Sequence, residues 1–117
     1  MKYLCLIYSE EKRIAAFSET EYNAAVSEYM AFTESVRNSG HLVASERLQP
    51  TQTATTIRSR NGKVSTTDGP FAETKEQLGG FYLIDAKDLN EAIQVASKIP
   101  GTRFGSIEVR PIWEMNG

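Results

Sequence analysis

Apolar residues recur along this chain at two spacings, one typical of strands and one typical of helices. Residues 2–8 are apolar on both alternating faces, and residues 81–84 repeat that pattern after a Gly-Gly pair. A strand of this kind is covered on both sides, so the two segments are predicted to be neighbours in the centre of a sheet. A last strand is predicted over residues 106–114.

Two segments with helical spacing lie between the predicted strands. The first helix is expected over residues 19–39, because Ser18 and Glu21 form a capping box and Gly40 supplies the left-handed residue that often ends a helix. The second is expected to begin at the cap residue Asp88. Its predicted buried stripe consists of Leu89, Ala92, Ile93 and Ala96.

The middle of the chain has the period of strands. Residues 41–48 alternate, which places Glu46 on the same face as Leu42 and predicts a buried carboxylate. Residues 53–60 and 63–67 are rich in β-branched side chains and flank Asn-Gly, the preferred pair for a two-residue hairpin turn. The polar residues 71–78 are interpreted as a central loop with one short helical turn.

The order strand, helix, strand, hairpin, strand, helix, strand predicts a single α+β domain over residues 1–117. Two crossover helices fit the ferredoxin-like arrangement, in which both helices cover one face of an antiparallel sheet. The other face would then be bare although it carries large apolar side chains. A second copy is the simplest cover, so we expect a homodimer that forms a dimeric α+β barrel.

Composition narrows the classes of partner. The chain has 13 basic and 15 acidic side chains, a net charge of −2, so neither nucleic acid nor an anionic membrane is an expected partner. The single cysteine, Cys5, cannot form an intrachain disulfide, which indicates a reducing cytoplasmic location. No signal peptide is recognised, and no metal or other cofactor is expected.

Three stretches resemble the YCII-related family, in its DGPF-motif branch. They are TDGPFAETKEQLGGFYLI at 67–84, GHLVASERLQP at 40–50 and GSIEVRPI at 105–112. The resemblance implies a dimeric α+β barrel, a small-molecule enzyme role through a histidine and aspartate pair in some members, and a frequent genomic association with sigma factors. Of that pair, only Asp68 lies within the matched motif. His41 stands in a different local context from the family histidine.

Asp68 is the first candidate for chemistry. It follows a strand and precedes Gly-Pro, where a buried carboxylate could act as a general base. The alternative is an Asx turn, in which the carboxylate bonds to nearby backbone amides. Glu73 and Lys75 could line a cleft beside it, with Glu73 sharing a proton and Lys75 neutralising an anionic substrate, or they could form a solvated loop.

His41 and Glu46 are further candidates. Histidine exchanges protons near neutral pH, but His41 follows a helix end and could simply interact with that helix C-terminus. A buried Glu46 would need a partner, for which Arg58 and Arg110 are available, or would lie in a polar cavity.

Two functions remain open. The first is a small-molecule enzyme that uses Asp68 with Glu73, assisted by His41, near the central loop. The second is a non-catalytic dimeric module that binds a ligand or a protein such as a sigma factor.

Overall fold

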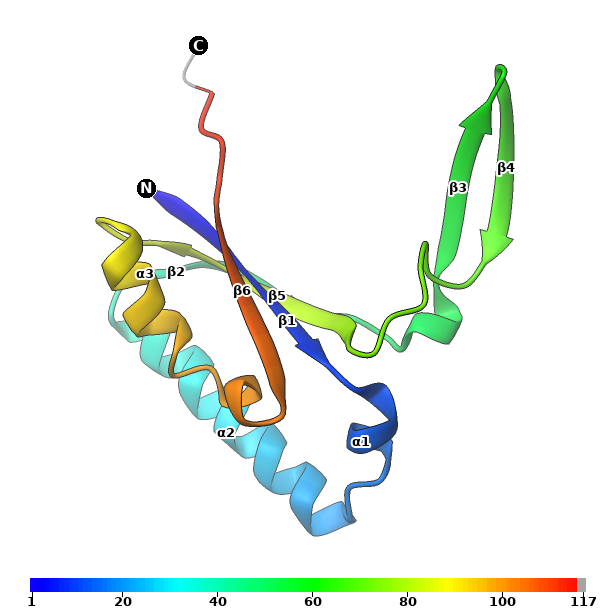
Figure 1. Cartoon of the computed structure of the whole chain (residues 1–117). Coiled ribbons are helices and arrows are strands. Elements are labelled where there is room, and N and C mark those ends of the chain that lie inside the picture. The colour runs from blue at the N-terminus through cyan, green and yellow to red at the C-terminus, as the bar shows by residue number, and fades with distance from the viewer. Residues whose placement is uncertain (116–117) are drawn as a thin grey trace.

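A computed structural model describes residues 1–115 and contains one four-stranded antiparallel sheet and one separate two-stranded hairpin (Figure 1). The sheet has the strand order β2-β5-β1-β6. Its strands are β1 (Lys2–Ser9), β2 (Leu42–Arg47), β5 (Gln77–Asp85) and β6 (Gly105–Pro111), and the hairpin strands are β3 (Thr55–Arg60) and β4 (Lys63–Asp68). The helices are α1 (Glu11–Ala15), α2 (Glu19–Asn38) and α3 (Leu89–Ala96), with 3-10 turns η1 (Thr51–Thr53) and η2 (Pro100–Arg103).

This topology confirms the predicted ferredoxin-like α+β fold with a hairpin inserted between its second and third sheet strands. Helices α2 and α3 lie on the same side of the sheet (Figure 1). As expected, β1 and β5 are the central pair, joined in antiparallel register from Lys2 opposite Asp85 to Ser9 opposite Gln77. No helix among the described residues is both long and apolar enough to cross a lipid bilayer.

The core lies between the sheet and the two long helices. The central strands supply Tyr3, Cys5, Tyr82 and Ile84, all almost completely buried. From α2, Phe32 meets the Tyr82 ring edge-on at a centroid distance of 5.0 Å. Burial also raises the pKa of the Cys5 thiol to about 11. The cysteine is therefore a small core residue without a disulfide.

Helix α2 begins and ends as its sequence predicts. The Ser18 hydroxyl accepts from the Glu21 amide, and the Glu21 carboxylate accepts from the Ser18 amide. At the other end Gly40 has φ 83°, and the His41 amide donates to the Val36 carbonyl. These bonds form a capping box and a Schellman motif, which fix both ends of the helix.

Three local predictions need correction. A short helix, α1, follows β1 where none was expected, and β5 begins at Gln77, inside the segment interpreted as a loop. In α3 the predicted stripe is half wrong, because Leu89 and Ile93 are 47% and 48% exposed. The small side chains Ala92 and Ala96 face the sheet instead, which allows this helix to approach it closely.

A bulge in β2 overturns the predicted environment of Glu46. The register shifts between Leu42 and Ala44, so Leu42 pairs with the buried Ile84 while Glu46 pairs with Phe81 on the opposite face. Glu46 is exposed, and the expectation of a buried carboxylate is wrong. Neither proposed partner contacts it, because Arg110 pairs with Glu108 and Arg58 donates to the Phe71 carbonyl.

The hairpin prediction is confirmed, but its placement was not foreseen. Asn61 and Gly62 both have positive φ, 51° and 78°, as a two-residue hairpin turn requires. Strands β3 and β4 project away from the sheet as an arm (Figure 1). Its apolar residues Ile57 and Val64 are 66% and 70% exposed.

Candidate functional site

Asp68 lies at the base of the arm, at the end of β4, and its side chain is exposed. The turn after it is held by backbone groups, since the Gly69 amide donates to the Ala54 carbonyl at 2.7 Å. The Thr56 hydroxyl donates to the Gly69 carbonyl at 2.8 Å. The structure therefore places the Asp68 carboxylate at the surface of a well-bonded turn.

Glu73 and Lys75 follow in the exposed segment 70–75. This segment is attached to the sheet at its end, where the Ser106 hydroxyl donates to Glu76 at 2.8 Å. Neither Glu73 nor Lys75 lines the cavity described below. Asp68, Glu73 and Lys75 are thus close in sequence, but none of them lines this cavity.

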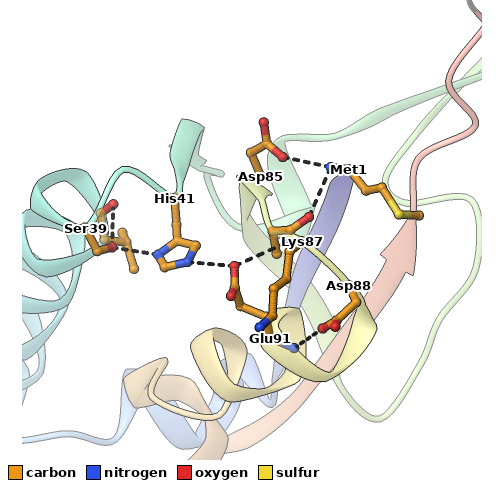
Figure 2. Close-up of polar contacts among 9 residues, drawn as sticks. Met1, Ser39, His41, Asp85, Lys87, Asp88 and Glu91 are labelled. Atoms are coloured by element: carbon orange, nitrogen blue, oxygen red, sulfur yellow. Dashed lines mark hydrogen bonds and ion pairs between the residues drawn. The ribbon is translucent and has the colours of Figure 1, made fainter.

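His41 is part of a polar joint between α2 and α3 (Figure 2). Its Nδ1 lies 2.7 Å from Ser39 Oγ, and its Nε2 lies 3.1 Å from Glu91 Oε1. The Lys87 amide also donates to Glu91. This joint lies at the opposite end of β2 from the arm, so the structure does not bring His41 and Asp68 together (Figure 1).

A cavity of about 760 Å³ lies between the sheet and α2. Its floor includes Ile7, Gly80 and Arg47, which lie across β1, β5 and β2 in one row. Glycine is required at position 80, because a Cβ there would lie 2.8 Å from the Glu46 carbonyl of the neighbouring strand. Apolar side chains of α1, α2 and the loop after η2 complete the walls, among them Ile14, Phe17, Val26, Met30 and Phe104.

Hydroxyl groups gather on one side of this cavity. Tyr82 Oη lies 2.7 Å from Thr33 Oγ1, and Thr33 in turn donates to the Tyr29 carbonyl at 2.8 Å. Burial raises the pKa of Tyr29 to about 12, and burial also raises the pKa of Tyr82. Both phenols are therefore neutral at physiological pH. A side chain on Gly101 would meet the Tyr29 hydroxyl at 2.4 Å, so this glycine makes room for it.

Glu11 fixes the mouth of the cavity. Its carboxylate accepts from the Thr51 amide at 2.8 Å and from the Thr51 hydroxyl at 2.6 Å, while its own amide donates to Gln77 at 2.9 Å. These bonds join α1, η1 and the start of β5. The wall of the cavity and the base of the arm are thus held by the same carboxylate.

Comparison with known proteins agrees with this architecture. The model of the YCII-related domain matches residues 1–116. The chain belongs to the YCII-related family. An uncharacterized protein of Rhizobium meliloti (strain 1021) is 41% identical over 114 residues, which are 96% of this chain and 92% of that protein.

A solved structure of this fold contains a quinone ligand. It is the 5-chloro-2-hydroxyhydroquinone dehydrochlorinase TftG from Burkholderia phenoliruptrix AC1100, in complex with 2,5-dihydroxybenzoquinone. The TM-score is 0.56 at 13% identity, with 99% of this YCII-related chain and 96% of TftG covered. The likeness establishes the fold.

The residues around the cavity were missed by reasoning from the sequence. None of Tyr29, Tyr82, Arg47 and Glu11 was predicted from the sequence as a site residue. The one signal available was the Gly79-Gly80 pair, since glycine in a strand often marks a place where another group approaches the backbone closely. The pair lacks the spacing of a phosphate-binding loop, so it predicts no site of that kind.

Proposed function

We propose that this YCII-related protein binds a small organic molecule in the cavity between the sheet and α2 and acts on it as an enzyme. The observation that carries the proposal is the cavity itself, at about 760 Å³, with apolar walls and a few converging hydroxyl groups. Ligand sites in proteins have this size and this mixture of groups. The hydroxyquinone enzyme of the same fold supports the choice of a small aromatic substrate.

A cavity-filling substitution tests the binding site. Ala25 of α2 lines the cavity, whereas its neighbour Ala24 is exposed and does not. A panel of hydroxyquinones and aromatic acids should raise the Tm of the wild type and of Ala24→Trp, but not that of Ala25→Trp. Equal stabilisation of both variants, or no stabilisation of the wild type by any member, would refute the proposal.

Catalysis by Asp68 with Glu73 is the more detailed part of the proposal, and His41, which lies at the other end of β2 and bonds to Ser39 and Glu91, takes no part in it. Membership of the DGPF branch is inferred from the motif at residues 68–71, and this motif is what supports a role for Asp68, whose exposed carboxylate lies at the base of the arm. The panel members that bind should be screened for turnover, including chloride release from halogenated hydroquinones. Asp68→Asn should abolish turnover while ligand-induced stabilisation is retained; undiminished turnover would exclude Asp68.

We also propose that the protein is a homodimer that associates through the open face of the sheet. Leu4, Leu6, Phe81 and Leu83 point away from the helices and are only partly buried. Charged side chains on the edge strands surround them, with Glu46 on β2 and Glu108 and Arg110 on β6. An apolar centre within a polar rim is the usual composition of a protein interface.

A buried lone cysteine fits the proposed cytoplasmic location.

A non-catalytic binding module remains the second candidate, and the exposed arm favours it. Ile57, Val64 and Phe71 offer apolar contacts, and Arg58 with Arg60 offers positive charge. The proposed partner is a sigma factor. Co-purification with the sigma factor of the same organism should be lost in Ile57→Asp, whereas Ile93→Asp on the far helix should retain it.

A further inference from the structure

The charges around the cavity are distributed unevenly. Five charged residues line it; three of them are engaged in hydrogen bonds or an ion pair, and a fourth belongs to the other face of the sheet. Glu34 pairs with Arg37, and Glu11 uses both carboxylate oxygens on Thr51. The Glu46 side chain belongs to the open face of the sheet. In the described part of the chain, one positively charged side chain of the lining is therefore free of an ion pair and available to bind a ligand.

That cation is Arg47. It is paired with Gly80 and lies on the helix-side face of the sheet, at the edge of the cavity. Its Nη2 donates to Tyr22 Oη at 2.7 Å, and its guanidinium lies 5.6 Å from the centroid of the same ring. Within residues 1–115 no carboxylate lies within ion-pair distance of it. Arg47 is thus held in place by an aromatic ring while most of its donors are uncommitted.

The hydroxyl groups next to it have defined hydrogen-bonding roles. Thr33 has a single hydroxyl proton and gives it to the Tyr29 carbonyl, so the Tyr82 hydroxyl must donate to Thr33. Tyr82 therefore offers lone pairs to the cavity. Tyr29 keeps its proton at neutral pH and has no hydrogen-bond acceptor among the described residues. The positive charge of Arg47 acts at Tyr29, where it opposes the effect of burial on the pKa.

We propose that the cavity selects small aromatic acids: Arg47 binds the carboxylate, and the Tyr29 hydroxyl donates to an oxygen on the ring. The apolar walls cover the ring, and an arginine beside an aromatic side chain is well suited to bind a carboxylate through two parallel hydrogen bonds. This inference rests on the proposed function, because it names the class of ligand for the same cavity.

A matched pair of competitors tests the inference. N-phenyl-1-naphthylamine, an uncharged fluorescent probe, reports occupation of the cavity. The two competitors are 1-naphthoate and 1-naphthamide, which differ in charge but hardly in shape. We expect the acid to displace the probe from the wild type about tenfold more effectively, as a charged hydrogen bond implies. Arg47→Gln should remove this preference for the acid over the amide, and Arg47→Lys should retain part of it; the two competitors are compared within each variant, relative to the affinity of that variant for the probe.

Arg60→Gln is the matched control, because Arg60 lies at the tip of the arm and outside the cavity. It should retain the full preference for the acid. If the probe binds and Ala25→Trp excludes it, but acid and amide compete equally in the wild type, the inference about aromatic acids is wrong while the proposed function stands. If the probe fails to bind, or binds Ala25→Trp as well, the proposed function fails instead.

Discussion

Three side chains near the core resist the loss of a proton. Burial raises the pKa of Cys5 and Tyr29 to about 11 and about 12, and it raises the pKa of Tyr82. The unfolded chain has the lower pKa values, so it releases these protons first as the pH rises. The stability linked to these groups is complete below about pH 9 and is lost progressively toward pH 12.

Tm should therefore fall steeply between pH 9 and 12 in thermal melts followed by circular dichroism. Tyr29→Phe should flatten the part of this fall above pH 10, because the variant lacks one of the shifted groups. Tyr22→Phe, which alters an exposed ring at the cavity mouth, serves as the control and should retain the wild-type slope. A Tyr29→Phe profile parallel to that of the wild type would contradict the assignment.

Truncating an isoleucine in the core should reduce the free energy of unfolding far more than truncating one in the arm. Ile84 is completely buried between the sheet and the helices, whereas Ile57 is 66% exposed on the arm. Ile84→Ala leaves a cavity and should cost about 2–5 kcal/mol, while Ile57→Ala should cost less than about 0.5 kcal/mol. Chemical denaturation measures both values. Similar costs at the two positions would mean that the arm is buried in solution.

At the scale of elements, the sequence predicts the helix ends and turns that are determined by residues close together in the chain. The capping box at Ser18, the glycine after α2 and the Asn61-Gly62 turn each act through residues only a few positions apart, and all three were recognised. The strand and helix order then limits the sheet to few topologies. This is why the ferredoxin-like fold followed from the sequence.

Elements that depend on tertiary contacts could not be predicted in the same way. The bulge in β2 follows from pairing with β5, and it moves Glu46 to the open face although the alternation of the sequence is unbroken. The cavity similarly combines Tyr29, Arg47 and Gly101, which are separated by most of the chain. Candidate residues chosen from one motif, such as Asp68 and Glu73, could not reveal this arrangement.

The arm should open as a unit separate from the sheet. A two-stranded hairpin is marginally stable by itself, and β3 and β4 contact each other far more than they contact the sheet. In hydrogen-exchange measurements the amides of β3 and β4 should exchange through local opening, while those of β1 and β5 exchange only on global unfolding. Gly62→Val, which disfavours the positive φ of 78° at the turn, should accelerate exchange in the arm alone. Faster exchange in β1 would show that the two units are coupled.

At the scale of the whole molecule, the single chain is wider than its length implies. Its radius of gyration is 16.3 Å, against about 13 Å for a compact domain of this length. The excess reflects the projecting arm, and the open face adds partly exposed leucine and phenylalanine side chains. Association with a second copy through this face would bury apolar surface that one chain cannot cover.

Sedimentation equilibrium should accordingly report twice the 13.0 kDa mass of one chain at micromolar concentration. Leu6→Glu places a charge at the centre of the open face and should yield a folded monomer, because Leu6 does not belong to the buried core. Leu89→Glu places the same charge on the exposed side of α3 and should leave the dimer intact. A wild-type monomer at high concentration would exclude the proposed interface. A Leu6→Glu dimer would instead mean that the copies associate through another surface, for which the arm is the next candidate.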